Sequence, residues 1–407
     1  MPECRNKVII GAGLSGLVAA YWCKEQDPSQ SVCLYEKQPE TLSWMRRARL
    51  GPTCLGQVWD QPWREEDFPR GLPWIRAALD KWAGTSLRDW FQSHSLPVQT
   101  TGTGTLFVEK PNAFAESLQQ VVKETGVKIK TGYSLESISR QPDGTFRIWS
   151  RDGQADVCQG LLIATGGERN HGMALARELG ATENPCLPAY LRLRLASSRL
   201  ADSLGVIERE VRVRCPRTGT AVTGMAQLSA RGLEGPAISD LSSRFCEDWK
   251  QRGYRIKLEL DWIPSQSPSS IRSELDSRCL TGRRKGIGET ALFGLSERQW
   301  HGFLQLARID PETPWLRLKG RQLQTLVQRL KSHSLSFSGM GLPSHERVWA
   351  GGILAEEIDW GTGASRSADR VYYAGEIMDA LGRPGGAHLN LMFASAYLAG
   401  SGMALSS

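Results

Sequence analysis

Two glycine-rich turns, each with acids nearby, are the residues of this sequence best suited to hold a ligand. The first carries Gly11, Gly13 and Gly16 after the apolar run 7–10, and Glu36 follows twenty residues after Gly16. Such glycines permit a tight turn and let backbone approach a pyrophosphate, while an acid at that spacing holds ribose hydroxyls. The amides that open the next helix face the phosphates. We therefore expect a dinucleotide-binding turn here.

The second turn lies near the C-terminus and indicates which dinucleotide binds. The apolar run 371–374 ends in Gly375-Glu376, Asp379 follows, and Gly385-Gly386 opens a long apolar helix over 387–404. An acid at a strand end can accept hydrogen bonds from ribityl hydroxyls, and a helix N-terminus offers positive potential to a flavin C2 carbonyl. A nicotinamide cofactor does not need this element, whereas FAD does. The alternative is that these glycines only pack a helix on a strand.

Three residues are candidates for the chemical step. His388 lies just inside the predicted C-terminal helix, and beside a flavin an imidazole can donate a hydrogen bond or a proton to a reduced substrate. Its alternative role is a solvent-exposed residue near a helix start. Cys54 and Asn390 complete the catalytic set, and Cys54 has the alternative of a packed small hydrophobe.

The predicted cofactor-binding set combines both turns with residues near the ends of apolar runs. It comprises Gly11, Ala12, Gly13, Leu14, Ser15, Gly16, Glu36, Lys37, Arg46, Leu135, Thr165, Gly166, Gly375, Glu376, Asp379, Gly385, Gly386, Ala387, His388 and Leu389. The segment 43–55 follows the second apolar run directly, so it should lie near the pyrophosphate. Six scattered histidines show no metal-ligand spacing, and we predict no metal site.

The elements that must position these residues alternate between strands and helices at both ends of the chain. The apolar runs 31–35 and 160–164 are typical of buried strands, and the patterns 113–125 and 172–179 are typical of helices. The stretch 40–75 shows no period, and we expect loop with short helices there.

The middle of the chain has a different character. Alternating basic strands at 191–195 and 209–214 are followed by helices, including 297–307 and 323–331. The last seventy residues return to the pattern of the first part. We therefore predict an α/β fold with a discontinuous Rossmann-like FAD-binding domain at 1–187 and 346–407, interrupted by an inserted substrate or cap domain at 188–345.

Charge gives a second hint about partners. The 407 residues carry a net charge of +7 with a pI near 9.0, and the excess is mostly arginine in the middle of the chain. An ordinary basic surface explains this, and so does an anionic partner such as RNA or a phosphorylated substrate. An RNA contact through the Arg-rich insert therefore stays open.

The chain shows no sign of a membrane or secreted protein. Its apolar segments are shorter than the roughly 18 uncharged residues that a membrane helix requires, and its N-terminus lacks a signal-peptide pattern. Nine scattered cysteines, an odd number, favour reduced thiols. We expect a cytoplasmic protein that does not bind membranes, and the sequence leaves its oligomeric state open.

Several motifs spread along the chain carry a family resemblance. They are Gly11 to Gly16, Ile163 to Gly167, Gly172 to Gly180, Pro188-Ala189, Gly232 to Ile238, Ala350 to Ile353, Tyr373 to Asp379, Gly385-Gly386 and Ala394 to Gly400. On these motifs the sequence resembles the NAD(P)/FAD-dependent oxidoreductases of the BaiN/RdsA type, also called aminoacetone-oxidase-like flavoproteins.

The resemblance implies more than the motifs alone. It implies FAD in a domain like that of glutathione reductase, and an insert of barrel-like strands plus helices. Members of the family are linked to NAD(P)H-dependent reduction of activated carbon–carbon double bonds, in ribosomal RNA uridine and in bile-acid enones, and to amine oxidation. Three positions near the flavin depart from the family pattern: the loop around Cys54, Ser229-Ala230, and the stretch 387–390. These departures concern the substrate and the proton donor more than FAD.

These observations predict an FAD-dependent oxidoreductase. Reduced flavin would pass hydride to one carbon of a polarised double bond, and His388 would protonate its neighbour. Electrons would come from NAD(P)H, docking transiently, because the sequence has no second intact G-x-G-x-x-G. One rival is a flavin oxidase that acts on a small amine or amino ketone. The other is an RNA-binding flavoprotein whose flavin is structural.

Overall fold

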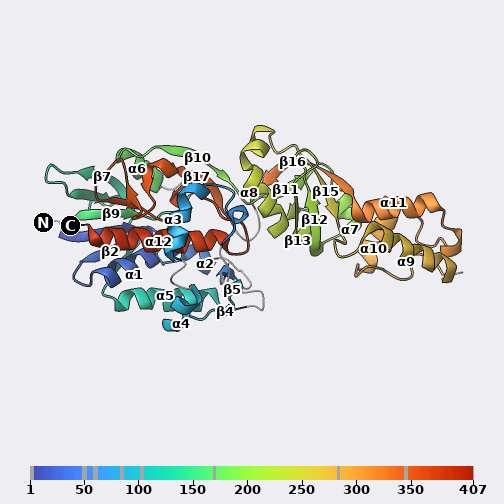
Figure 1. The fold of residues 1–407 in the computed structure, drawn as a ribbon, viewed down its shortest axis with the longest axis horizontal. Coiled ribbons are helices and arrows are strands. Elements are labelled where there is room, and N and C mark those ends of the chain that lie inside the picture. The colour runs from blue at the N-terminus through green and yellow to red at the C-terminus, as the bar shows by residue number, and fades with distance from the viewer. Residues whose placement is uncertain are drawn as a thin grey trace. The chain divides into compact units, whose positions relative to one another are not determined.

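The computed structural model describes residues 4–47, 53–57, 63–82, 87–100, 105–167, 171–281, 285–342 and 347–406. The chain divides into two compact units (Figure 1). Unit 1 comprises Met1–Pro188 and Val348–Ser407, and unit 2 comprises Ala189–Arg347. Each unit has its own buried apolar core. Unit 2 is therefore inserted into the chain of unit 1.

A largely parallel sheet forms the centre of unit 1. Its strands are β1 Cys4–Ile10, β2 Val32–Glu36, β6 Lys128–Thr131, β7 Leu135–Arg140, β8 Phe146–Ser150, β9 Ala155–Ile163, β18 Ile358–Asp359, β19 Ala364–Ser365 and β20 Val371–Tyr373. The order across the sheet is β18-β19-β20-β9-β1-β2-β6, and β8 joins the β7–β8 hairpin to β9. β20, β9, β1, β2 and β6 pair in parallel. Their carboxyl ends therefore meet at one edge.

The central strands form because their residues are apolar and buried on both faces, as a covered parallel sheet requires. Val8, Ile9 and Leu34 have no exposed surface. Lys7 is a buried charged residue of β1. Its Nζ donates to the Ser406 carbonyl oxygen at 2.7 Å and to the Ser406 hydroxyl at 3.0 Å, and burial lowers the pKa of Lys7. The start of the first strand is thus tied to the end of the chain.

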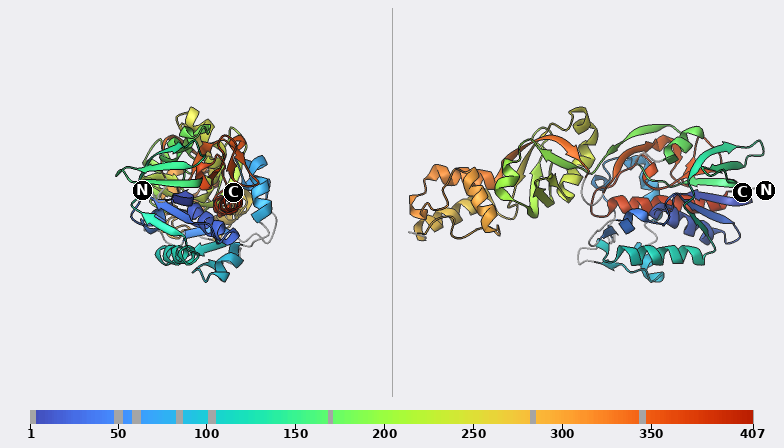
Figure 2. Two further views of the ribbon diagram at one scale, coloured as in Figure 1. Left: turned by 90° about the vertical axis from the view of Figure 1, so that its left-hand side faces the viewer. Right: turned by 180° about the vertical axis from the view of Figure 1, so that it is seen from behind.

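Two helices from opposite ends of the chain pack together on this sheet. They are α1 Leu14–Gln26 and α12 Ala387–Leu405, and they run side by side in all views (Figures 1 and 2). A Cβ at Gly400 would overlap the Ala19 carbonyl oxygen, so only glycine allows this backbone contact. The contact brings the C-terminal turn to the N-terminal turn.

Unit 1 contains further helices and two small groups of strands. The helices are α2 Ser43–Arg47, η1 Glu65–Asp67, α3 Leu72–Trp82, α4 Leu87–Ser93, α5 Pro111–Glu124, α6 His171–Glu178, η3 Ala355–Glu357 and η4 Gly375–Ile377. A small sheet joins β3 Thr53–Gln57, β5 Thr105–Val108 and β4 Gln99–Thr100, and a ladder joins β10 Glu183–Pro188 to β17 Trp349–Ile353. Helices α5 and α6 confirm the predicted patterns. Strand β3 was missed, because its pairing with β5 leaves no period in the sequence.

A closed barrel and a group of helices make up unit 2. The barrel order is β11 Arg192–Leu195, β14 Gly232–Glu234, β13 Ala221–Ser229, β12 Ile207–Arg214, β15 Lys257–Asp261 and β16 His333–Gly341. The helices are α7 Arg199–Leu204, α8 Pro236–Gln251, α9 Pro268–Thr281, α10 Glu297–Leu306, η2 Trp315–Arg317 and α11 Gly320–Lys331. In β12, Val211 and Val213 are buried whereas Arg212 and Arg214 are exposed. The basic strands therefore turn their charges outward.

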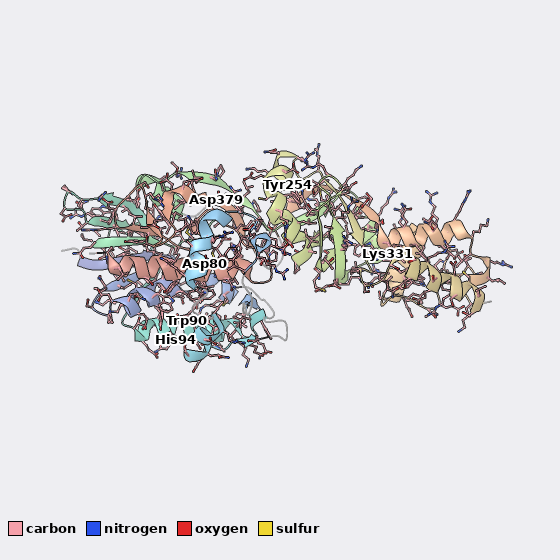
Figure 3. The ribbon with its side chains drawn as sticks, viewed as in Figure 1. Asp80, Trp90, His94, Tyr254, Lys331 and Asp379 are labelled. Atoms are coloured by element: carbon pink, nitrogen blue, oxygen red, sulfur yellow. The ribbon has the colours of Figure 1, made fainter. Side chains whose placement is uncertain are left out.

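Unit 2 also contains buried titratable groups. Lys331, on α11, pairs with Asp261 at 2.6 Å (Figure 3). Burial and Arg329 lower the pKa of His333 to about 4, and its Nδ1 accepts a hydrogen bond from Trp262 at 3.3 Å. These contacts satisfy core groups of unit 2. Among the residues that the structure describes, no helix is long and apolar enough to span a bilayer.

Candidate FAD site

The carboxyl edge of the parallel sheet collects most of the predicted cofactor residues. Gly11–Gly16 follow β1, Glu36 ends β2, Tyr133–Leu135 follow β6, Thr165-Gly166 follow β9, and Gly375-Glu376 follow β20. Ligands of open α/β sheets bind at this edge. The fold therefore brings the N-terminal turn to the C-terminal turn, although more than 350 residues separate Gly16 from Gly375 in the sequence.

The three glycines of the first turn have different roles. Gly11 has a φ of +102°, and a Cβ there would lie 2.5 Å from the Ala164 carbonyl oxygen. A Cβ at Gly16 would overlap the Gly11 carbonyl oxygen. At Gly13, by contrast, a Cβ would meet no atom within 4 Å. Gly11 and Gly16 are thus required by the fold, whereas Gly13 leaves space in front of α1.

The start of α1 is prepared for an anion. Gly13 is its N-cap and provides no side-chain cap. The first four N–H groups of a helix have no partner within the helix. Since no acid lies in the first turn of α1, these N–H groups and the helix dipole are available to phosphate.

Glu36 is held at the end of β2 by two amides. Its Oε2 accepts from the Ala12 N–H and its Oε1 from the Gln38 N–H, each at 2.8 Å. Each carboxylate oxygen can accept a second hydrogen bond. Glu36 is therefore oriented and can still accept from ribose hydroxyls.

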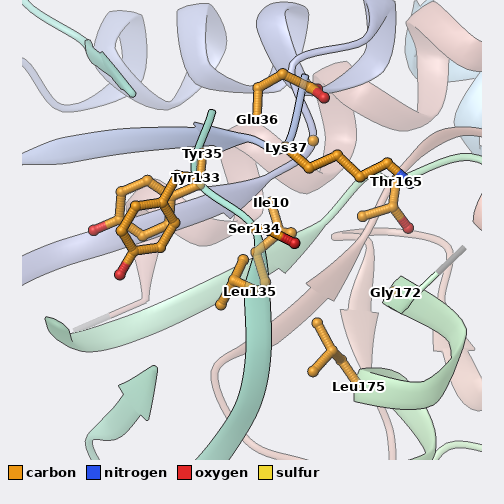
Figure 4. Close-up of a pocket in the computed structure, with 11 residues that line it drawn as sticks. Ile10, Tyr35, Glu36, Lys37, Tyr133, Ser134, Leu135, Thr165, Gly172 and Leu175 are labelled. Atoms are coloured by element: carbon orange, nitrogen blue, oxygen red, sulfur yellow. The ribbon is translucent and has the colours of Figure 1, made fainter. Parts of the chain in front are cut away.

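A cavity of about 70 Å³ lies between these segments (Figure 4). Its lining residues are Ile10, Gly11, Tyr35, Glu36, Lys37, Tyr133, Ser134, Leu135, Thr165, Gly172 and Leu175. The Thr165 hydroxyl is buried and has no hydrogen-bond partner among the described residues. A buried hydroxyl without a partner is costly, and a bound polar ligand would satisfy it. The apolar slot, the acid and the hydroxyl fit the adenosine half of FAD.

One wall of this cavity is a stacked pair of tyrosines. The rings of Tyr35 and Tyr133 lie 4.3 Å apart, across the cavity from Thr165 (Figure 4). The Tyr35 hydroxyl donates to Asp156, and burial together with that carboxylate raises the pKa of Tyr35. Lys130 pairs with Asp156 at 3.2 Å. The polar contacts of Asp156 therefore hold this wall in place.

Six lining residues were missed from the sequence: Ile10, Tyr35, Tyr133, Ser134, Gly172 and Leu175. Tyr133 and Ser134 come just after the end of β6, and Glu36 likewise stands at the end of β2. Their place at a strand end could have revealed them from the sequence. Gly172 and Leu175 lie on α6, whose placement only the fold determines. A Cβ at Gly172 would overlap the Thr165 hydroxyl, so glycine keeps that hydroxyl in place.

The second turn contacts the first. Gly375 has a φ of +80°, a Cβ there would lie 2.5 Å from the Ser15 hydroxyl, and its N–H donates to Ser395 at 3.1 Å. Ser15 itself donates to the Met392 carbonyl oxygen at 3.4 Å. Gly166 also has a positive φ, of 80°. Gly375 and Ser15 therefore pack the two turns together.

Asp379, expected at the cofactor, is bound by protein groups. Its carboxylate pairs with Arg70 through two nitrogens, one at 2.7 Å, and accepts from Asn184 at 2.7 Å and from the Gly351 N–H at 3.0 Å. Only 7 % of its side chain is exposed (Figure 3). The structure therefore gives Asp379 a role in joining segments of unit 1.

The side chain of His388 also contacts protein groups. Its Nδ1 accepts from the Gly382 N–H at 3.3 Å, so the ring proton lies on Nε2, which is 3.5 Å from Glu376 Oε1. The same Glu376 oxygen accepts from the Trp349 N–H at 3.0 Å. His388 and Asn390 are both buried in the first turn of α12. The candidate proton donor thus has a defined tautomer.

The remaining predicted residues lie on different elements of unit 1. Gly385 is exposed and Gly386 is the N-cap of α12, with no side-chain cap, while Ala387 and Leu389 pack into the core of unit 1. Arg46 donates to the Thr41 carbonyl oxygen at 3.0 Å and lies 3.5 Å from Glu116, so it contacts its own loop and α5. The Cys54 backbone belongs to β3, and its side chain lies outside the described residues. No cluster of metal-ligating residues occurs in the described part of the chain.

Comparisons with known proteins identify the family. The model of the HI0933-like protein Rossmann domain matches residues 5–402. The chain belongs to the HI0933-like family. This confirms the resemblance and the Rossmann-like fold predicted from the sequence.

Two curated relatives cover most of this HI0933-like chain. The 3-dehydro-bile acid delta(4,6)-reductase of Clostridium scindens is 26 % identical over 406 residues, or 96 % of this chain and 97 % of the relative. The ribosomal RNA dihydrouridine synthase of Escherichia coli K12 is 24 % identical over 339 residues, or 79 % of this chain and 80 % of the relative.

Solved structures share the fold of this family member. Escherichia coli quinol fumarate reductase FrdA matches with a TM-score of 0.51 at 13 % identity, over 99 % of this chain and 70 % of that chain. The 3-ketosteroid-delta4-(5alpha)-dehydrogenase of Rhodococcus jostii RHA1 matches with a TM-score of 0.50 at 11 % identity, over 99 % of this chain and 97 % of that chain. Family, fold and relatives agree on an FAD-dependent oxidoreductase.

Proposed function

We propose that this FAD-dependent oxidoreductase uses NAD(P)H to reduce an activated carbon–carbon double bond, such as that of a conjugated enone. The observation that carries the FAD assignment is the cavity lined by Glu36 and Thr165, together with the space that Gly13 leaves in front of α1. The choice of reaction is supported by the similarity to a bile-acid reductase over nearly the whole chain. When bound, FAD supplies two-electron hydride chemistry between the nicotinamide and the substrate.

In this proposal, residues of this chain bind FAD and orient the proton donor. Glu36 accepts from ribose hydroxyls, the first amides of α1 face the pyrophosphate, and the first turn of α12 places positive potential near the flavin. The Gly382 N–H fixes the His388 tautomer that carries its proton on Nε2, and Glu376 orients the ring. A substrate that takes this proton must approach Nε2 beside Glu376.

The substitution His388→Ala tests the proton donor. We expect an unchanged FAD content and an unchanged rate of flavin reduction by NAD(P)H, while substrate reduction slows at least about 100-fold, a typical contribution of general acid catalysis. Single-turnover kinetics separate the two steps. Unchanged substrate turnover contradicts the role of His388.

The reaction class is tested by reoxidation of the reduced protein. Anaerobic mixing with a conjugated enone should restore the oxidised flavin spectrum with loss of the double bond. Air alone should restore it slowly. Rapid reoxidation by oxygen with stoichiometric peroxide, and no reaction with enones, would support an amine or amino-ketone oxidase instead.

A second candidate substrate is a uridine in RNA. In unit 2 the exposed cations Lys285, Arg317, Lys319 and Arg321 lie near the start of α11, and no acid occurs from Thr313 to His345. Barrel arginines such as Arg214 and Arg217 instead pair with Glu259 and Asp248, at 3.1 and 2.5 Å. The similarity to the ribosomal RNA dihydrouridine synthase adds support.

Salt dependence tests this RNA contact. If these cations bind phosphates, the affinity for RNA should fall steeply with salt, and Arg317→Gln with Arg321→Gln should reduce the slope of log K against log[salt] by about 1 to 2. Arg214→Gln, which removes a paired arginine, is the control. RNA binding that is absent or insensitive to salt contradicts this candidate.

A further inference from the structure

Two short segments of unit 1 carry charges in complementary order. Asp67 ends η1 and Arg70 follows it, whereas Asp379 and Arg383 lie between η4 and α12. The segments pair in antiparallel fashion at Arg70 and Leu381. Antiparallel pairing sets Arg70 against Asp379 and Asp67 against Arg383. Each acid therefore meets a base of the other segment.

The Arg70–Asp379 pair is the stronger of the two. The Arg70 guanidinium reaches both carboxylate oxygens through Nε and Nη2, a geometry that is both strong and directional. Asp379 is 7 % exposed and Arg70 is 24 % exposed. Asn184 and the Gly351 N–H occupy the remaining acceptor sites of Asp379. Arg70 is thus a cation that balances a buried carboxylate within the second turn.

Backbone bonds and a second ion pair extend this contact toward α12. The Leu381 N–H donates to the Arg70 carbonyl oxygen at 3.1 Å, and the Arg383 N–H donates to the Asp67 carbonyl oxygen at 2.8 Å. Arg383 Nη1 also lies 3.5 Å from Asp67 Oδ1. The segment 67–71 therefore holds the backbone on both sides of Gly382.

The same backbone determines where α12 begins. The Gly382 N–H donates to His388, and the His388 N–H donates to the Arg383 carbonyl oxygen at 3.4 Å. A Cβ at Gly382 would overlap the His388 backbone nitrogen, so the turn is closed tightly on the helix start. Movement of 379–383 must then move the first turn of α12.

We propose that Arg70 is a positioning residue for the flavin: through Asp379 it fixes the 379–386 turn and thereby the N-terminus of α12. This proposal rests on the FAD function proposed above. Positive potential at a helix N-terminus favours the anionic reduced flavin over the neutral oxidised one. A displaced α12 start should therefore weaken binding of the reduced form more than that of the oxidised form.

The test uses the full chain with the variants Arg70→Gln, Arg70→Lys and Arg383→Gln. Arg64→Gln is the matched control, because Arg64 lies just before η1, and its side chain is 71 % exposed and pairs at the surface with Glu66. Two quantities are measured. The first is amide hydrogen exchange of the peptide 379–388 in the FAD-free protein. The second is the midpoint potential of the bound flavin.

Arg70→Gln should speed exchange in 379–388 at least tenfold. It should also lower the ratio of reduced-flavin to oxidised-flavin affinity about tenfold, which is about 30 mV for a two-electron couple. Arg70→Lys should recover part of both effects, and Arg64→Gln should change neither. Wild-type exchange and potential in Arg70→Gln overturn the proposal. If Arg70→Gln does not fold, Arg383→Gln should shift both quantities in the same direction, about threefold, and no shift there overturns the proposal.

The FAD function and the role of Arg70 can be contradicted separately. If the wild-type chain binds no FAD, the proposed function fails, while exchange in the FAD-free protein still decides whether Arg70 fixes the turn. If FAD binds and is reduced normally but Arg70→Gln changes neither quantity, only the role of Arg70 fails.

Discussion

The two turns at the sheet edge use their polar groups in opposite ways. At the first turn, a Cβ on Gly13 would meet nothing within 4 Å, and the Thr165 hydroxyl beside this turn is buried with no hydrogen-bond partner among the described residues. At the second turn, Asp379 accepts from three protein residues, and both nitrogens of His388 lie near protein groups. The first turn is built to contact a ligand directly, whereas the second is built to hold itself in one place.

This difference teaches that an acid beside a glycine-rich turn has no single meaning. Glu36 is oriented by two amides and retains acceptor capacity, so it suits ribose hydroxyls. Asp379 uses its acceptor capacity within the protein. Substitutions at the two turns should therefore separate folding from cofactor binding.

The largest effect is expected for Gly16→Ala. Its Cβ would overlap the backbone oxygen of Gly11, which cannot move without distorting the turn, so unfolding free energy should fall by more than about 3 kcal/mol. Thermal unfolding of the FAD-free protein measures this. A variant as stable as the wild type would show that α1 does not pack as described.

Asp379→Asn is expected to have the next largest effect. It removes the charge that balances Arg70, and because Arg70 is about a quarter exposed, we expect a loss of about 2 kcal/mol, below the range for fully buried pairs. Urea unfolding of the FAD-free protein gives the value. Unchanged stability together with lost FAD affinity would instead assign Asp379 to the cofactor and break the comparison.

Gly13→Ala should affect binding alone. Gly13 has a φ of −76°, which alanine adopts, and the added methyl meets no protein atom within 4 Å. Stability of the FAD-free protein should stay within about 0.5 kcal/mol of the wild type. Because the methyl enters the space in front of the α1 amides, the dissociation constant for FAD should rise about tenfold. Equal FAD affinity, measured by fluorescence titration, contradicts a pyrophosphate at this position.

Thr165→Val should give the smallest change. It should affect the stability of the FAD-free protein and the affinity for FAD in opposite directions. Valine keeps the shape but removes a hydroxyl that has no hydrogen-bond partner in the described part of the chain, so the FAD-free protein should be as stable or slightly more stable. FAD affinity should fall by about 1 kcal/mol, or about fivefold, through one lost hydrogen bond. Titration calorimetry of the variant and the wild type, compared at equal stability, measures this loss of FAD affinity. A loss of stability without a loss of affinity would place the hydroxyl outside the cofactor contact.

The sequence predicted the fold well where local pattern determines structure. The apolar runs around Ile9 and Leu162 became central parallel strands, and the Arg-rich alternation near Val211 became a barrel strand. Strand β3 could not be predicted, because five residues paired with β5 leave no repeating pattern. At β3, local pattern therefore failed because a short element depends on a distant partner.

The site was less predictable than the fold. Glu36 follows from its spacing to Gly16, but Leu175 reaches the cavity only through the placement of α6. The role of Asp379 depends on Arg70, Asn184 and Gly351, which lie far from it and from one another in the sequence. No local spacing encodes such a set of partners.

The central claim is that this chain holds FAD and passes electrons from NAD(P)H through it. The most direct measurement is the visible spectrum of the purified protein, reconstituted with FAD and titrated anaerobically with NADH and NADPH. We expect one FAD for each chain, with its visible absorption lost on addition of one of the two nucleotides. A colourless protein that FAD cannot reconstitute, or a bound flavin that neither nucleotide reduces, would contradict the account.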